Sequence, residues 1–180
     1  HVAVMPHSVY TTTAAQLTAC RELADELGLP LHIHLAETRQ ETALSLEQHG
    51  LRPVAHADRL GLLRPGTILA HVVDVDADEI ALLARRGVSV VHNPSSNMKL
   101  ASGVAPVPAM LDAGVRLALG SDGAASNNRL NMFTEMGRAA LLHKAAGDPE
   151  TMPARAVLDM ATRGGAAAMG GDGGVLAVGR

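Results

Sequence analysis

Aromatic residues and cysteine are almost absent from this chain of 180 residues, which has one Phe, one Tyr, one Cys and no Trp. Its formal net charge is only −3, so there is no basic excess either. Nucleic-acid surfaces need basic patches or stacking rings, and this composition therefore argues against nucleic-acid binding. No stretch approaches the roughly 18 to 20 apolar residues of a membrane span, so we expect no membrane segment.

The single cysteine, Cys20, excludes an intrachain disulfide and any metal site built from several cysteines. It lies in step with Leu17, Leu23 and Leu27 on the apolar side of a predicted helix. We interpret it as a small buried hydrophobe, the usual environment of a free cysteine. A cytoplasmic location is the expectation that follows.

Both ends of the chain suggest a fragment. The first residue is His1 rather than Met, and the next few residues are already strand-like, with no charged-then-apolar leader. The chain stops at Arg180 in what resembles the beginning of another strand.

Short apolar segments alternate with helical patterns along the chain. The predicted strands are Val2–Met5, Leu31–Ala36, Thr67–Ala70, Ser89–Val91 and Val115–Leu119. The first predicted helix has its N-cap within Thr11–Thr13, runs to about Leu27 and is closed by Gly28. The other predicted helices are Glu41–Gln48, Val54–Leu60, Asp76–Arg86 closed by Gly87, Pro108–Ala113, Met132–Ala146 and Pro153–Thr162. We expect polar loops after the last two strands and a glycine-rich connector over Gly164–Gly174.

This alternation indicates an α/β fold, because brief strands that are apolar on both faces are typical of a parallel sheet covered by helices. Two architectures remain open, a doubly wound open sheet and part of a closed barrel. A dinucleotide-binding open sheet would carry a glycine-rich turn directly after a strand, and no strand here has that spacing.

Polar residues capable of chemistry follow the predicted strands one set at a time. They are His7, then His34 with Glu37, then His71, then His92, and finally Ser121 with Asp122. In a barrel of parallel strands all these positions open onto the mouth where active sites form. Four histidines in consecutive units, out of nine in the chain, make this a stronger signal than any one of them.

The residue types suit a catalytic metal site. Neutral imidazole and carboxylate are the usual ligands of catalytic zinc, with one position left for water. The metal lowers the pKa of that water from about 15.7 to near 7. Such a site needs a further carboxyl group to move protons, and Glu37 lies three residues after His34.

Five segments carry a family resemblance: Pro6–Thr11, His32–Thr38, Ala70–His71, His92–Gly103 and Gly120–Asn128. They resemble the amidohydrolase superfamily, and within it the branch of 5-methylthioadenosine/S-adenosylhomocysteine deaminases and their triazine-hydrolase relatives. The resemblance covers essentially the whole chain in the right order, and the last two segments are long enough to be specific.

The resemblance implies the C-terminal half, about strands 4–8, of a TIM (β/α)₈ metal-dependent hydrolase barrel. Residues 1–168 would form the partial barrel, and residues 169–180 would begin a truncated C-terminal connector or β-sandwich segment. Zn²⁺ is the implied divalent metal, one per subunit, with Fe²⁺ as an alternative. The implied partners are a small-molecule nucleoside and the missing N-terminal half-barrel, while a homo-oligomer is left open.

Roles also follow from the resemblance. His34 would be a metal ligand, and Asp122 would bind the metal, accept a proton from the attacking water and contact the substrate. Glu37 would bind the substrate and protonate the ring nitrogen beside the carbon under attack. His71 would hold and polarise the hydroxide or the developing oxyanion. His7 would contact the sugar or ring of the substrate.

Two departures from the family pattern stand out. The first barrel strand should supply a His-x-His pair for the metal, and this chain lacks that strand. His32 and His34 form such a pair themselves, but only three strands follow them and Glu37 fits the fifth-strand motif, so we reject that reading. Ser121 stands where Thr is commoner, which should change little.

Structural interpretations compete with these roles. Taken alone, His34 is consistent with a buried core histidine and Glu37 with a helix-cap residue. Asp122 with Gly123 is consistent with an ordinary turn, and His7 with a loop residue. His92 is equally consistent with structure and with the site, and His32 is expected to pack. We expect Lys99 and Asn97 to order their loop, and His49, His56 and His143 to lie at the surface.

The preferred interpretation is a metal-dependent hydrolytic deaminase that releases ammonia from an adenine nucleoside such as 5-methylthioadenosine or S-adenosylhomocysteine. One alternative is an amidohydrolase or chlorohydrolase acting on a triazine, guanine or a pyrimidine. Another is an inactive fragment that lacks the first-strand metal pair. The second zinc-deaminase class requires several cysteines and is excluded.

Overall fold

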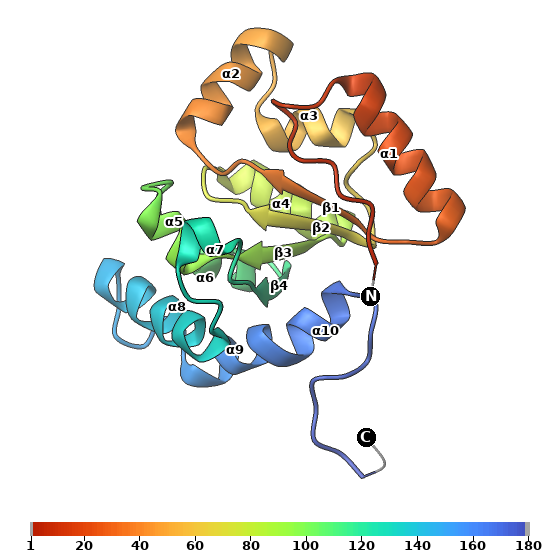
Figure 1. The fold of residues 1–180 in the computed structure, drawn as a ribbon. Coiled ribbons are helices and arrows are strands. Elements are labelled where there is room, and N and C mark those ends of the chain that lie inside the picture. The colour runs from red at the N-terminus through yellow and green to blue at the C-terminus, as the bar shows by residue number, and fades with distance from the viewer. Residues whose placement is uncertain (1, 179–180) are drawn as a thin grey trace.

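The computed structural model describes residues 2–178 and centres on a four-stranded parallel sheet (Figure 1). Its strands are β1 (Leu31–Leu35), β2 (Thr67–His71), β3 (Ser89–His92) and β4 (Arg116–Leu119), side by side in that order. They match four of the predicted strands to within a residue or two at each end. The α/β class is therefore confirmed.

Strand register brings the predicted site residues to one edge of the sheet. Leu35 lies beside His71 in the β1–β2 pair, and His92 lies beside Leu119 in the β3–β4 pair. Because all strands run in one direction, their carboxyl ends meet at the same side, on the left in Figure 1. This is the edge at which ligands bind in parallel α/β folds.

The segment predicted as a strand at Val2–Met5 follows the outer edge of β1 but does not form a continuous strand. The N-terminal segment makes one-residue bridges to β1 at Val4, opposite Leu31, and, beyond the predicted strand, at Ser8, opposite His34. Val4 donates to the Pro30 carbonyl and accepts from the His32 amide. Pro6 has no N–H for the next ladder position, so the pairing is interrupted there.

Local capping explains where the long helices begin and end. α1 (Ala14–Leu27) starts with a capping box between Thr13 and Gln16, and α4 (Ala77–Arg86) starts with one between Asp76 and Glu79. Both end at the predicted glycine, Gly28 and Gly87, in the left-handed conformation. The other helices near their predicted positions are α2 (Arg39–His49), α3 (Pro53–Arg59), α6 (Val107–Asp112), α8 (Met132–Ala146) and α9 (Ala154–Asp159).

Two short helices occupy segments predicted as loops, α5 (Pro94–Lys99) after β3 and α7 (Ala124–Asn127) after β4. The glycine-rich connector prediction was also wrong in its first part. A π-helix, η1 (Met160–Gly164), and the helix α10 (Gly165–Ala168) run through it. A Cβ at Gly164 would overlap the Leu117 carbonyl oxygen, so this glycine serves close packing against β4 rather than a flexible loop.

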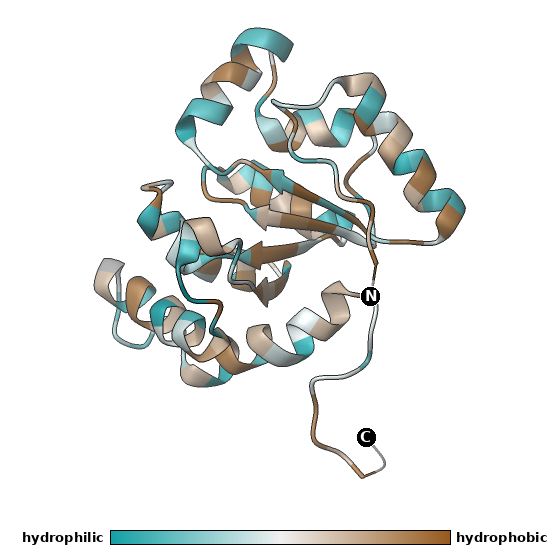
Figure 2. Cartoon of the chain, in the orientation of Figure 1, coloured by the Kyte–Doolittle hydropathy of each residue, from teal (hydrophilic) through white to brown (hydrophobic). Residues whose placement is uncertain are grey.

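The sheet has two chemically different faces. In β1 the side chains of Leu31, Ile33 and Leu35 are buried, while His32 and His34 between them are only half-buried. The strands are the most uniformly apolar elements in Figure 2, and the helices around them are mixed. Among residues 2–178 no helix is long and apolar enough to cross a membrane.

Candidate metal and catalytic site

His34, His71 and Asp122 meet at the carboxyl edge of the sheet. Each offers one ligand atom, and the three atoms lie within 4.8 Å of one another. His34 comes from β1, His71 ends β2, and Asp122 follows β4. Glu37 is the fourth member of this group, with its Oε2 3.9 Å from Nε2 of His71. The sequence prediction that these four side chains gather at one place agrees with this geometry.

The orientation of His34 is set by the backbone of the neighbouring N-terminal segment. Its Nδ1 lies 2.7 Å from the carbonyl oxygen of His7. A carbonyl can only accept, so Nδ1 carries the proton and Nε2 of the neutral ring keeps a free lone pair. This is the usual way a protein orients a metal-binding histidine. Sequence reasoning assigned His7 a role for its side chain only and missed its carbonyl.

His71 is buried and held on both sides of its ring. Its backbone is left-handed, with φ 74°, an uncommon conformation for a residue with a side chain. Nδ1 lies 2.8 Å from Oδ1 of Asn97 on α5, which leaves Nε2 toward Glu37. Asn97 was expected to order its loop, and it does so by contacting a site residue directly. Strained backbone that persists at such a point is typical of functional sites.

Asp122 also has a left-handed backbone, with φ 59°. Two serine hydroxyls donate to its Oδ2, Ser96 at 2.7 Å and Ser126 at 2.6 Å. Burial by itself would raise the pKa of Asp122, but these hydrogen bonds outweigh it and the pKa is lowered. The side chain is therefore a carboxylate at neutral pH, the form in which it can bind a cation or accept a proton.

Glu37 is positioned by a second, buried glutamate. The side chain of Glu41 is 3% exposed, and its two oxygens accept the backbone N–H groups of Ala36 at 2.9 Å and of Glu37 at 2.8 Å. Ala36 is left-handed, with φ 52°, so the carboxylate stabilises a strained turn. Glu37 itself accepts from the Ser102 hydroxyl at 3.0 Å through Oε1. Glu41 carried no signal in the sequence beyond that of a helix residue.

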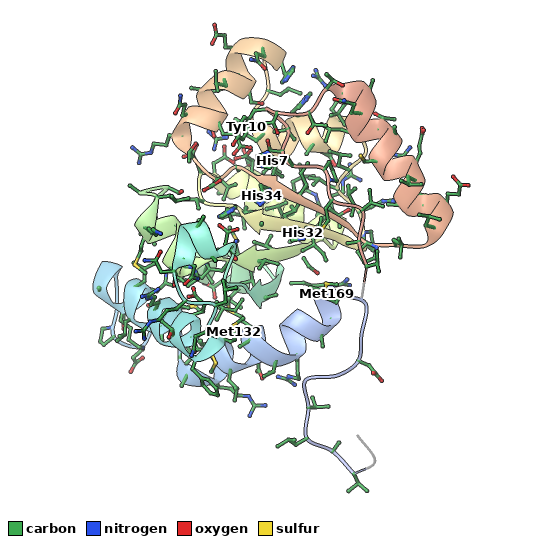
Figure 3. All side chains as sticks on the ribbon, in the orientation of Figure 1. His7, Tyr10, His32, His34, Met132 and Met169 are labelled. Carbon is green, nitrogen blue, oxygen red and sulfur yellow. The ribbon has the colours of Figure 1, made fainter. Side chains whose placement is uncertain are left out.

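His7 lies at the exposed side of the cluster. Its Nδ1 is 2.7 Å from Oγ1 of Thr11, and its ring centroid is 5.0 Å from that of His34. Tyr10, His7, His34 and His32, labelled in Figure 3, follow one another with ring centroids 5.0 to 6.3 Å apart in successive pairs. The ring of Tyr10 packs edge-on against His7 at 6.2 Å.

The remaining histidines among the described residues lie outside this group of candidate ligands. His32 shares the face of His34, with ring centroids 6.3 Å apart, as expected. His92 is fully buried, and its ring centroid lies 5.4 Å from that of His143 on α8. The expectation of surface positions was wrong for His143 and His56, which are 4% and 2% exposed. Helical periodicity locates one face of a helix but does not say which neighbour covers it.

The residues present fit a divalent cation. His34 offers a lone pair at Nε2, Asp122 offers an ionised oxygen, and a ring nitrogen of His71 lies beside them. Nitrogen and carboxylate oxygen in this combination are the donor set of catalytic zinc sites. Asn97 contacts His71 and Ser96 contacts Asp122, and both of these partners come from α5 rather than from the strands that lead to the candidate ligands.

The geometry agrees with comparisons to known proteins. The model of the amidohydrolase family matches residues 1–180. A 5-methylthioadenosine/S-adenosylhomocysteine deaminase of Desulfovibrio desulfuricans is 68% identical over 93% of the chain. The chain spans only 38% of that relative's length.

Two solved structures superpose closely on the chain. An adenosine deaminase from Xanthomonas campestris with bound zinc has a TM-score of 0.92 and 48% identity over 96% of this chain and 40% of its own. An atrazine chlorohydrolase from Arthrobacter aurescens TC1 complexed with zinc has a TM-score of 0.91 and 32% identity over 98% and 40%. The fold is thus that of part of an amidohydrolase barrel. The chain belongs to the amidohydrolase family.

Proposed function

We propose that this chain carries the catalytic carboxyl edge of a metal-dependent deaminase that acts on an adenine nucleoside such as 5-methylthioadenosine or S-adenosylhomocysteine. The observation that carries the proposal is the meeting of His34, His71 and Asp122 within 4.8 Å, with Glu37 beside them. The names of the two relatives at 68% and 48% identity, both deaminases of adenine nucleosides, support this substrate class.

His34 and Asp122 would hold the cation, with Zn²⁺ as the proposed ion. Further ligands are expected from a His-x-His pair outside this chain, as the family resemblance implies. The ion, when bound, makes water acidic enough to serve as a nucleophile at neutral pH. The remaining chemistry belongs to the side chains of this chain.

The proton transfers follow from the arrangement of the two carboxylates. Asp122 accepts a proton from the attacking water, and Nε2 of His71 orients that water and the oxygen after attack. Glu37 gives a proton to the ring nitrogen next to the amine-bearing carbon. Asp122 then passes its proton to the amine, which leaves as ammonia, and the hydroxyl proton of the product returns to Glu37 as the ring carbonyl forms. Proton transfer of this kind typically contributes about 10² to 10⁴ in rate.

Substrate contact is proposed for His7, Glu37 and Asp122. His7 lies at the exposed edge of the cluster, where a sugar or ring can reach it while the amine-bearing carbon faces Asp122. We also propose the boundary after Ala168, where α10 ends, as the end of the barrel segment. A cytoplasmic location and a homo-oligomeric state stand as proposals of the same kind.

Substitution of the two carboxylates tests the mechanism. In the full product of the gene we expect Asp122→Ala and Glu37→Ala each to remove nearly all ammonia release from 5-methylthioadenosine, because each deletes a proton-transfer group. Glu47→Ala, on the outer part of α2, is the control and should keep wild-type turnover. Retained turnover in both site variants would refute the mechanism.

A second candidate substrate class is a triazine or another heterocycle. It is favoured by the atrazine chlorohydrolase that superposes at 32% identity. A substrate panel comprising adenine nucleosides, guanine, a pyrimidine and atrazine separates the two, with ammonia and chloride release as the readouts. Turnover of atrazine but of no nucleoside would replace the proposed function.

A further inference from the structure

A fully buried carboxylate lies behind the site on α8. The side chain of Glu135 is 0% exposed, and the only nearby cation among the described residues, Arg138, is 3.9 Å away and partly exposed. Burying a carboxylate is costly unless donors satisfy it. All three of its close donors come from the two short helices that follow β3 and β4.

The donors connect these two helices to a single carboxylate. From α5, the Ser95 amide donates to Oε2 at 3.1 Å and the Ser95 hydroxyl donates to Oε1. From α7, Nδ2 of Asn127 donates to Oε1 at 3.0 Å. Nδ2 of Asn127 also donates to the Ser121 carbonyl at 2.6 Å, which fixes the backbone just before Asp122.

The residues next to these donors are the ones that hold Asp122. Ser96 follows Ser95 in α5, Ser126 precedes Asn127 in α7, and both donate to Oδ2 of Asp122. Glu135 is therefore connected to Asp122 through adjacent hydrogen-bonding residues in each of the two helices. On the exposed side Lys99 joins the same two helices by donating to the Ala125 carbonyl at 2.6 Å.

We propose that Glu135 is a positioning residue, which holds α5 and α7 so that Ser96 and Ser126 fix the carboxylate of Asp122 for the cation. Its importance for turnover rests on the proposed function, but its effect on cation binding does not. A purely structural glutamate would support the stability of α8 without changing how Asp122 meets an ion.

The test measures zinc affinity of the full gene product, stripped of metal and titrated with Zn²⁺ against a chromophoric chelator. We expect Glu135→Gln to weaken zinc binding by about 10- to 100-fold, because residues that hold metal ligands contribute on that scale. The amide of Gln replaces one acceptor with an N–H₂ group that opposes the Ser95 donors. Turnover should fall through kcat, with KM little changed.

Glu79→Gln is the matched control. Glu79 lies on α4, away from the cluster, and is also buried, at 5% exposure. Its Oε2 accepts a hydrogen bond from Nε of Arg52 at 2.7 Å. The Glu79→Gln variant should be less stable than the wild type but keep wild-type zinc affinity. If Glu135→Gln does not fold, Ser95→Ala removes one of the donors instead and should weaken zinc binding in the same direction.

A cycle of variants separates positioning from general damage. In a Ser96→Ala/Ser126→Ala background, Glu135→Gln should cause little further loss of zinc affinity, because the route to Asp122 is already removed. Fully additive losses, or wild-type affinity in both Glu135→Gln and Ser95→Ala, would overturn the proposal. Because zinc is titrated without substrate, an error in the proposed substrate class would change the ammonia assay but not the measured zinc affinity.

Discussion

At the scale of single residues, the most unusual side chain outside the site is His92. It is fully buried, and neither ring nitrogen has a hydrogen-bond partner within the part of the chain that the structure describes. Burial, with a smaller contribution from the neighbouring His143, lowers its pKa to about 3. The folded protein therefore keeps His92 neutral at pH values where an unfolded chain, with a histidine pKa of about 6.5, binds a proton.

The sign of the pH effect follows from this difference. Above pH 6.5 His92 is neutral in both states and stability does not depend on it. As the pH falls below 6.5 the unfolded state gains a proton that the folded state refuses, so the free energy of unfolding decreases until about pH 3. We expect His92 to account for a loss of about 2 kcal/mol between pH 7 and pH 5.

Replacing His92 with Leu tests this account. The pH-dependent loss of stability in His92→Leu should be smaller than in the wild type by that about 2 kcal/mol, since Leu fills a similar volume and does not titrate. Urea unfolding curves at pH 7 and pH 5 provide the measurement. Identical pH dependence in the two proteins would show that the buried imidazole is not the source.

At the scale of elements, η1 packs against β4 with no room for a side chain at Gly164. Gly164 ends the π-helix at the point where its missing side chain allows contact with the Leu117 carbonyl. The neighbouring Gly165 has room for a side chain, because the nearest atom, the Met160 carbonyl oxygen, would lie at an ordinary contact distance of 3.9 Å from an added Cβ. The two adjacent glycines therefore differ in what a methyl group would meet.

Alanine substitutions at these two glycines should have opposite effects. Gly164→Ala should destabilise the protein by about 1 to 3 kcal/mol, because α10 and η1 must move away from the sheet. Gly165→Ala should be neutral or stabilising by up to about 1 kcal/mol, because alanine is the better helix former. The measurement is the unfolding temperature of both variants relative to the wild type. Equal changes in unfolding temperature would contradict the packing argument.

At the scale of the whole molecule, the candidate cation site joins parts of the chain that are distant in sequence. His34, His71 and Asp122 belong to β1, β2 and the segment after β4, so a bound ion would link the two outer strands of the sheet across its carboxyl edge. Any ligand that binds only the folded state stabilises that state, by an amount that grows with the logarithm of the ligand concentration above its Kd.

Zinc should therefore raise the unfolding temperature. At a free zinc concentration 100-fold above its Kd, the gain is about 2.7 kcal/mol, and a chelator should reverse it. His34→Ala should abolish the effect, while His49→Ala, which alters a histidine stacked on His56 outside the cluster, should retain it. Differential scanning fluorimetry with and without metal gives the comparison, and an equal shift in both variants would place the bound zinc elsewhere.

The sequence by itself determined the α/β alternation and the residues at the centre of the site. Apolar runs, helix caps and terminal glycines are local signals, and they placed β1 to β4 and the capped ends of α1. Parallel strands share one carboxyl edge, so polar residues at or just after the strand ends lie along that edge, where His34, His71 and Asp122 meet.

Only the tertiary structure decided what surrounds those residues. The short helices α5 and α7 are too brief to be stable alone, so their existence depends on packing that no local pattern encodes. Glu41 and Glu135 are ordinary helix residues in the sequence, and their partners lie in other elements. Hydrogen bonds across the fold depend on which faces pack together, and that arrangement is set by the whole chain rather than by any segment of it.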